Sequence, residues 1–249
     1  MKTLYESLLD DLTDMEAKLD ITKLQSQILK FILDNYYCHP NCLEITGPDE
    51  NGLCYVSCKK RDVALEIRNK NVTSLTNGMF VWDKVYGNFI CRDCPNLTSL
   101  EGAPKEVGGS FNCQRCLKLT SLEGAPHLVG RFDCCFCDNL TSLKGAPKEV
   151  KEFFDCQHCS KLTSLEGAPQ LVGSFDCCFC DNLTSLKGAP KKVMMDFNCE
   201  YCDKLDSLKG APKIVNGDFY CGRKFSTTDV KKISKVKGRI GCRYLSYWN

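Results

Sequence analysis

With 249 residues, 43% of them hydrophobic, the chain holds enough apolar material for a continuous core, which argues against disorder. No apolar run has the length of a signal peptide or a membrane span, so a soluble cytoplasmic protein without a membrane partner is expected. The formal net charge is only +2, but residues 183–249 carry 14 Lys/Arg against 6 Asp/Glu. In a solenoid such an asymmetry more often reflects solvated lysines at the edges of the coils than a surface that binds a polyanion.

Residues 1–37 are expected to form two amphipathic helices. Leu and Met side chains three or four residues apart make one apolar stripe over residues 4–19, and Leu24, Ile28 and Ile32 make a second. A capping box of the form Thr-x-x-Glu/Gln precedes each stripe. Since neither helix can bury its apolar face alone, the pair is expected to cap the open N-terminal end of the following segment.

Residues 38–71 show no clear period and are expected to form an irregular cap or first coil. A turn is predicted at residues 47–52 and a strand at residues 65–67. Two Cys-x3-Cys pairs in this segment have a spacing that resembles metal ligation, although burial in a cap is the favoured interpretation and no metal site is predicted. The four metal candidates are Cys38, Cys42, Cys54 and Cys58.

From residue 72 to residue 224 the sequence repeats with a period of 21 or 22 residues. Leu-Thr-Ser-Leu begins units at Leu97, Leu119, Leu140, Leu162 and Leu183, and Leu205 begins a variant with Asp206 in place of Thr. A fixed period in this range is typical of repeats that combine one strand with a return segment. Residues 129–140 match the pattern L-x-x-L-x-L-x-x-C-x-x-L at every fixed position. The chain therefore resembles leucine-rich-repeat proteins, and L-T-S-L-E-G-A-P-K-E-V-G-G is similar to repeats of bacteriophages, large DNA viruses and some bacteria.

The resemblance implies an α/β solenoid, a right-handed leucine-rich-repeat coil with a parallel β-sheet on its concave side. In one unit it directs six residues inward: Val129, Phe132, Cys134, Cys137, Leu140 and Leu143. It places Asp133, Cys135 and Phe136 on the concave surface, and a Gly-Ala-Pro turn at residues 145–147 on the back of the coil, where Gly relaxes the backbone. In residues 225–249, a capping box from Ser226 to Asp229 predicts a short C-terminal capping helix, with a left-handed stop at Gly238.

Six Cys-x-x-Cys pairs occur within the repeat region: Cys91/Cys94, Cys113/Cys116, Cys134/Cys137, Cys156/Cys159, Cys177/Cys180 and Cys199/Cys202. Such pairs suit zinc or iron–sulfur ligation, and disulfides are a further alternative. The period favours inward thiols instead, because stacked coils lie about 4.8 Å apart, whereas two sulfurs on one zinc ion are no more than roughly 4 Å apart. Thiols in a chain without an export signal are expected to be reduced. We therefore expect a ladder of buried thiols and no cofactor.

The register predicts three columns of side chains on the concave surface. The first holds Asn112, Asp133, Asp155, Asp176 and Asn198; the second Gln114, Cys135, Gln157, Cys178 and Glu200; the third Arg115, Phe136, His158, Phe179, Tyr201 and Arg223. An acidic stripe beside exposed aromatics makes nucleic acid an unlikely partner, because its backbone needs a basic track. The pattern suits a protein that presents Lys or Arg beside an apolar anchor. The alternative is that duplication copied these residues without selection for binding.

The expected function is protein recognition without catalysis. No catalytic motif occurs in the sequence, which holds only three histidines, His39, His127 and His158. The resemblance implies a phage or viral protein that recognises a host or viral protein in the host cytoplasm. One alternative is a structural component of a virus particle. The other is a polyanion binder that uses Lys187, Lys191, Lys192, Lys209, Lys213, Lys231, Lys232 and Lys235.

Overall fold

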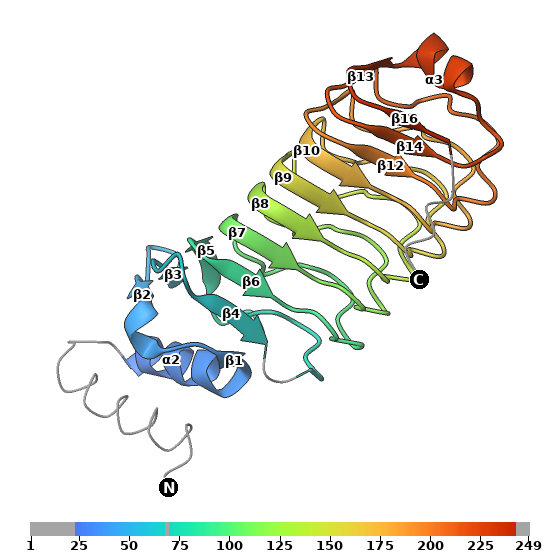
Figure 1. Cartoon of the computed structure of the whole chain (residues 1–249). Helices are drawn as coiled ribbons and strands as arrows, with labels where there is room; N and C mark the ends of the chain where they lie inside the picture. Colours follow the sequence, from blue (N-terminus) through green and yellow to red (C-terminus); the bar gives the residue numbers. More distant parts are fainter. Residues whose placement is uncertain (1–22, 68–69, 243–249) are drawn as a thin grey trace, which may run out of the picture.

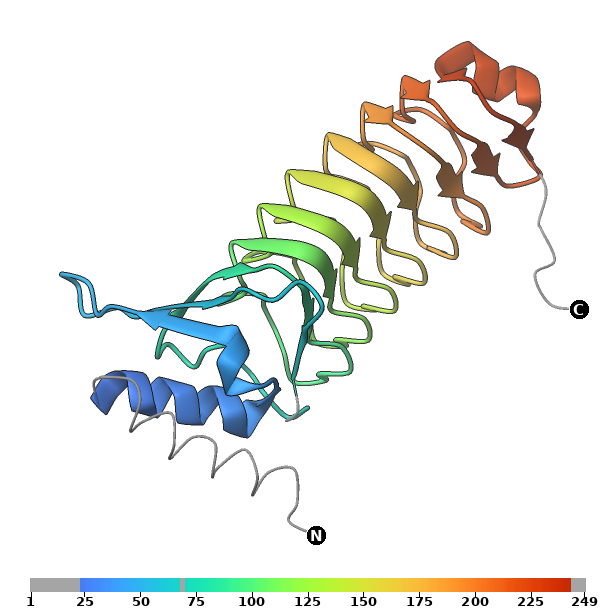
Figure 2. The same cartoon turned by 60° about the vertical axis from the view of Figure 1, so that its left-hand side comes forward.

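The chain forms a β-solenoid, whose parallel strands stack side by side along the length of the molecule (Figures 1 and 2). The computed structural model describes residues 23–67 and 70–242. The predicted solenoid with a parallel sheet is thus confirmed. The helix predicted over residues 4–19 lies outside the described residues.

The N-terminal part contains one described helix and the only antiparallel strand pairings in the described residues, β1 with β4 and β2 with β3. Its elements are α2 (Lys23–Asn35), β1 (Tyr36–Tyr37), the 3-10 turn η1 (Pro40–Cys42), β2 (Leu43–Thr46), β3 (Tyr55–Cys58) and β4 (Ala64–Ile67). Ile28 and Ile32 of α2 are fully buried in the same hydrophobic core as the coils. The strand predicted at residues 65–67 is therefore confirmed as part of β4, which pairs in parallel with β6.

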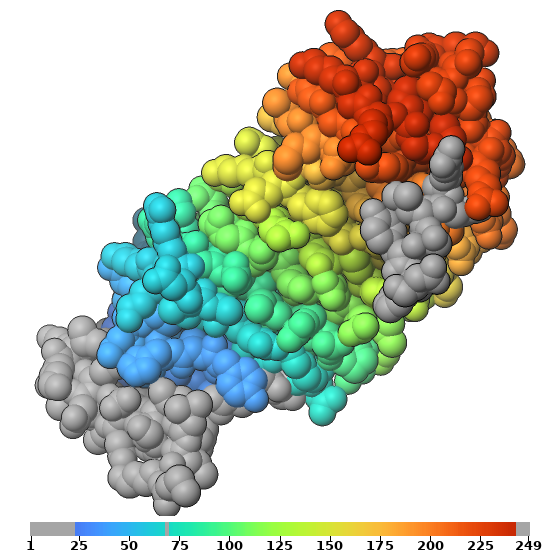
Figure 3. Space-filling model, in the orientation of Figure 1, coloured from blue at the N-terminus to red at the C-terminus, as the bar shows by residue number. Residues whose placement is uncertain are grey.

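Strands of the repeat region pair only in parallel, each with the strand of the next coil. They are β5 (Val81–Val85), β6 (Asn88–Ile90), β7 (Glu106–Asn112), β8 (Leu128–Asp133), β9 (Glu149–Asp155), β10 (Leu171–Asp176), β11 (Lys192–Val193), β12 (Phe197–Cys199), β13 (Ile214–Val215) and β14 (Phe219–Cys221). After β10 each long strand is divided into two short ones by a bend, but the order of the coils is kept (Figure 3).

A spine of phenylalanine rings fills the interior of the coils. Phe111, Phe132, Phe154 and Phe175 are almost completely buried, and their ring centroids stack 5.2–5.3 Å apart. The six residues predicted to point inward between Val129 and Leu143 are all fully buried. The inward half of the predicted register is therefore confirmed.

The Gly-Ala-Pro turns bring the backbones of adjacent coils very close together. Gly145 has a φ of +88°, and a Cβ added there would lie 2.3 Å from the backbone nitrogen of Glu123. Only glycine combines a left-handed conformation with such an approach. The predicted role of this residue is therefore confirmed.

The C-terminal part returns to the sheet after a single short helix, α3 (Thr227–Ile233), followed by β15 (Lys235–Val236) and β16 (Ile240–Gly241). The predicted capping box is present, since the Ser226 side chain accepts from the Asp229 amide and the Asp229 side chain accepts from the Ser226 amide. The predicted left-handed stop at Gly238 is wrong: the helix ends at Ile233, and Ser234 is extended. The reason is that Lys235 and Val236 pair in parallel with β13.

Candidate functional site

Five successive coils each place one planar side chain at the turn that follows the strand, at the arrowhead end of the strands in Figure 1. We call this set the turn ladder: Arg115, Phe136, His158, Phe179 and Tyr201. The rings of its last four members stack face to face, with centroids 4.4, 4.5 and 4.3 Å apart. The guanidinium of Arg115 lies 5.3 Å above the Phe136 ring and ends the stack.

Every member of the turn ladder has a left-handed backbone, with φ between 54° and 57°. Asp93 has the same conformation in the preceding coil, with φ 56°, and one of its carboxylate oxygens lies 3.9 Å from Arg115 Nη1. The amides donate to carbonyls of the next coil, as from Phe136 to Gln157 at 3.0 Å and from His158 to Cys178 at 3.1 Å. The ladder is therefore held rigidly by the backbone as well as by stacking.

The first predicted column, which includes Asp133 and Asp155, has a structural role. In each of its five members one side-chain oxygen accepts a hydrogen bond from the amide two residues further on, at 2.9–3.1 Å. This is an Asx turn, a conformation that Asn and Asp favour through this bond. The column thus closes the turns from which the ladder projects. The Asn or Asp that stands two residues before each turn could have indicated an Asx turn. The expectation of an acidic stripe leaves this role out.

The second predicted column is less exposed than expected. Cys135, Cys178 and Glu200 are 6%, 4% and 3% exposed, and Asp155 of the first column is 9% exposed. The prediction that these four residues lie on the surface is wrong. Cys135, Cys178 and Glu200 follow the ends of their strands, where the left-handed turn keeps the side chains between neighbouring coils. Asp155 ends β9 and is held inward by hydrogen bonds from the Gln157 amide and side chain. Gln157 is half-buried and donates from Nε2 to Asp155 Oδ2 at 3.1 Å.

Three of these groups come close enough together to be considered as metal ligands. Donor atoms of Asp133, Cys135 and Asp155 lie within 4.8 Å of one another, the only such group of three His, Cys, Asp or Glu residues in the described part of the chain. The Cys135 thiol hydrogen-bonds to the Asp155 carboxylate, whose Oδ2 also accepts from Gln157. The Asp133 carboxylate accepts from the Gln114 side chain and the Cys135 amide. Hydrogen bonding within the fold therefore accounts for this cluster.

The four candidate cysteines near the N-terminus do not converge on one point. Cys42, Cys54 and Cys58 are buried, and Cys38 is half-buried. The Cys42 thiol interacts with those of Cys38 and Cys58. The interaction with Cys38 and burial raise the pKa of Cys42 to about 11, whereas the interaction with Cys58 opposes this rise. Cys54 takes no part in this set, and its raised pKa arises from burial.

The thiols of all six Cys-x-x-Cys pairs are buried, as predicted. In the central coils each pair bridges its neighbours: Cys134 Sγ donates to the Asp155 carbonyl at 3.3 Å, and Cys137 Sγ donates to the Cys113 carbonyl at 3.2 Å. The same two contacts recur from coil to coil. The pairs therefore act as small buried side chains that satisfy backbone carbonyls where the strands end.

Burial raises the pKa of three carboxyl groups beside the turns, Asp155, Asp176 and Glu200. The pKa of Asp155 is raised to about 6, mainly by desolvation, and that of Glu200 to about 7, by desolvation and then by the charge of Asp176. The Oε1 atom of Glu200 is buried without a hydrogen-bond partner among the described residues. Residues 114 and 157, in the same column, are both glutamines. The Glu200 carboxylate therefore destabilises the fold when it is ionised.

Replacing Glu200 by glutamine is expected to raise the free energy of unfolding by about 1–2 kcal/mol at pH 8 and to change it little at pH 4. The pKa of Glu200 is higher in the folded than in the unfolded chain. Its protonated form therefore contributes fully to the free energy of unfolding below the unfolded pKa of about 4.3, and this contribution is lost as the pH rises through about 7. Urea unfolding at both pH values measures the difference. Glu149→Gln, at an exposed carboxylate, is the matched control, and an equal gain in both variants would contradict the assignment.

No described helix is both long and apolar enough to cross a bilayer. Comparisons with protein-family models, with curated proteins and with solved structures found no match for this chain.

Proposed function

We propose that the chain is a non-enzymatic scaffold that recognises a protein partner through the turn ladder. The observation that carries this proposal is the presence of bulky planar side chains at a left-handed position in five successive coils. This conformation costs a residue other than glycine roughly 1–2 kcal/mol, and Asn or Asp tolerates it best, as Asp93 does one coil earlier. Aromatic residues kept there against the local preference of the backbone are typical of a functional site.

Duplication alone does not account for the ladder. The residue changes from Arg to Phe, His, Phe and Tyr along the coils, yet each side chain is planar and joins the same stack. A copied residue under no selection has no reason to change identity while its shape is kept. Phe136, next to Arg115 at the end of the stack, is still 36% exposed.

The geometry also changes the expected chemistry of the partner. Stacking covers the ring faces, so the ladder presents ring edges, which carry the positive part of the aromatic quadrupole. The carboxylates of the first column are half-buried or buried and already accept hydrogen bonds within the fold. We therefore expect a partner with apolar side chains and hydrogen-bond acceptors, in place of one rich in Lys and Arg. Rigid rings lose little entropy on binding.

The proposal includes the repeat family and its setting. The inward residues and the thiol contacts are consistent with the leucine-rich-repeat pattern, and α2 and α3 would then cap the two ends of the coil. The resemblance of the repeats to those of bacteriophages and large DNA viruses favours a phage or viral protein that acts on a host or viral protein in the host cytoplasm.

The double variant Phe136→Asn/Phe179→Asn is expected to lose the partner while it stays folded, because Asn fits the left-handed turns. Tagged native and variant chains would be used for affinity purification from infected or native host cells, with quantitative mass spectrometry of the captured proteins. A protein depleted at least tenfold with the variant is the expected partner.

Leu171→Asn/Met194→Asn is the matched control, since it also replaces two partly exposed apolar side chains, away from the ladder. It should capture the partner as the native chain does. Equal capture by the native chain and the ladder variant would contradict the proposal. Recovery in fixed proportion to virus particles, unaffected by the ladder variant, would favour the structural alternative.

A further inference from the structure

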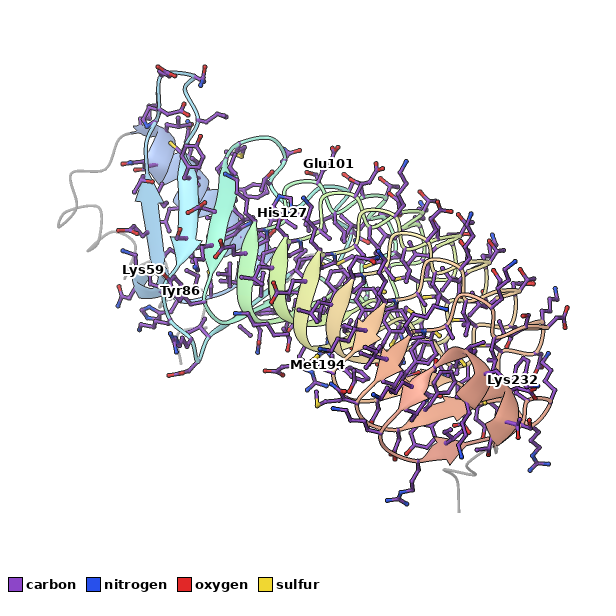
Figure 4. The ribbon with its side chains drawn as sticks, turned by 90° about the horizontal axis from the view of Figure 1, so that it is seen from above. Lys59, Tyr86, Glu101, His127, Met194 and Lys232 are labelled. Carbon is purple, nitrogen blue, oxygen red and sulfur yellow. The ribbon has the colours of Figure 1, made fainter. Side chains whose placement is uncertain are left out.

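A second surface lies at the opposite end of the strands from the turn ladder, where the chain enters each strand. We call it the basic column: Lys105, His127, Lys148, Lys191 and Lys213. These residues immediately precede β7, β8, β9, β11 and β13, and Gln170 fills the same place before β10. His127 is labelled in Figure 4. The column starts after Asp83, and from β7 to β13 it contains no carboxylate.

The members of the basic column are stacked in register. The His127 amide donates to the Lys105 carbonyl at 2.8 Å, and the Lys213 amide donates to the Lys191 carbonyl at 3.0 Å. Parallel strands set neighbouring members about 4.8 Å apart, so the six positions span about 24 Å. All six side chains are exposed. The result is a row of four lysines and one histidine along the solenoid, interrupted by Gln170.

The lysines of this column form no ion pair with any described residue, unlike lysines elsewhere on the coils. Lys144 lies 3.7 Å from Glu123 and Lys187 lies 4.0 Å from Glu166. In a third column Lys118, Lys161 and Lys204 donate to Asn side chains of the preceding coil at 2.6–2.9 Å. Those columns mix Lys with Glu or Asn from coil to coil, whereas the basic column contains no carboxylate. Like charges on neighbouring strands repel each other, so the uncompensated row favours an external anion.

Cavities lie at both ends of the row. One, of about 330 Å³, is lined by Lys105, His127 and Lys148 together with Glu123, which pairs with Lys144, and small residues of the Gly-Ala-Pro turns. The other, of about 510 Å³ beside α3, is lined by Lys209 and Lys213 and by two ion pairs. These pairs are Lys224 with Asp206 and Lys232 with Asp229, and Lys232 is labelled in Figure 4. Glycine and alanine of the turns contribute to the lining of both cavities, so side chains of the basic column stand beside hollows.

We propose that the basic column binds a linear chain of phosphate groups that carries no bases. A row of flexible ammonium groups neutralises such a polymer through charge alone. Proteins that hold single-stranded nucleic acid add aromatic platforms on which bases stack. Among the described residues, phenylalanine and tyrosine rings lie only at the two ends of this column. Lys105 Nζ lies 5.6 Å from the Tyr55 ring centre at one end, and Phe225 lines the cavity beside Lys213 at the other. The site is separate from the turn ladder, so it stands or falls independently of the proposed function.

The test compares two triple variants of the full chain with equal net charge. K148Q/K191Q/K213Q removes three lysines of the basic column, and K144Q/K161Q/K187Q removes three lysines of the paired columns. Binding of fluorescent inorganic polyphosphate, about 25 units long, is measured by anisotropy over a range of salt concentrations. Circular dichroism melting shows whether both variants stay folded.

The column variant is expected to lose at least tenfold in affinity, and its salt dependence should weaken by about two units of slope, since each phosphate on a single strand contributes roughly 0.7. The control variant should lose less than threefold. Equal losses in the two variants, or no binding by the native chain, would overturn the proposal. Binding of an oligothymidylate of equal phosphate count as tightly as polyphosphate would overturn the assignment to a base-free polymer.

Discussion

Gly145→Ala is expected to lower the free energy of unfolding by roughly 3–5 kcal/mol. Part of the loss, about 1–2 kcal/mol, is the cost of a side chain at a φ of +88°. The remainder arises because the new Cβ would lie 2.3–2.5 Å from backbone atoms of Leu122 and Glu123, which a side-chain rotation cannot relieve. Two coils would have to separate, and the hydrogen bond from the Ala146 amide to the Leu143 carbonyl would be disturbed.

Gly78→Ala supplies the control for this prediction. Gly78 has a φ of +71°, but a Cβ there meets no atom within 4 Å. It should therefore show the conformational cost of about 1–2 kcal/mol alone. Chemical unfolding of both variants measures the two losses. Equal losses would mean that close contact of the coils contributes nothing, which would contradict the packing described for the Gly-Ala-Pro turns.

The inward register could be predicted from the sequence because the period determines it. Residues that recur every 21 or 22 positions occupy equivalent places in stacked coils, and a buried column must be apolar in every copy. Phe132, Cys134 and Leu140 satisfy that condition, and all three are fully buried.

The outward residues could not be placed by the same reasoning. Alternation along a strand assigns Cys135 to the outer face only if the strand continues, and β8 ends at Asp133. The turn that follows is left-handed at Phe136, where the residue type gives no warning, since glycine or asparagine is the usual signal. The stacking of the ladder depends on coil spacing and turn geometry together, and so it appears only in three dimensions.

The C-terminal helix shows the same limit in another form. Its start was predictable from Ser226 and Asp229, because a capping box is a local arrangement. Its end was not, since the pairing of β15 with β13 overrides the local signal at Gly238. Tertiary pairing thus decides where short elements end.

The protection of the cysteine thiols is the second large effect expected. Nearly all the pair thiols have exposed fractions close to zero, and burial raises the pKa of Cys134, Cys156 and Cys177 well above the usual range. Thiolates are the reactive species, so both effects slow alkylation. Modification then requires opening of the coils, and we expect rates at least about a hundredfold below those of exposed thiols. Cys38 and Cys242, which are half-buried, should react first.

Cys135 and Cys178 make this experiment sensitive to the register itself. If the strands continued past Asp133 and Asp176, these two thiols would lie on the outer surface and react rapidly. With the left-handed turns in place they are buried against carboxylates, and their pKa values are raised by burial and by the neighbouring Asp residues. Their protection therefore reports on the turn that displays the ladder.

The position of the turn ladder depends on this register, in which both pair thiols are internal and the residue before the second thiol is external. The most direct measurement is timed iodoacetamide labelling of the native, metal-free protein, followed by mass spectrometry of each cysteine peptide. The predicted result is early modification at Cys38 and Cys242, with slow modification of the twelve pair cysteines and of Cys135 and Cys178. Rapid modification of most pair cysteines, or of Cys135 and Cys178 alone, would contradict it.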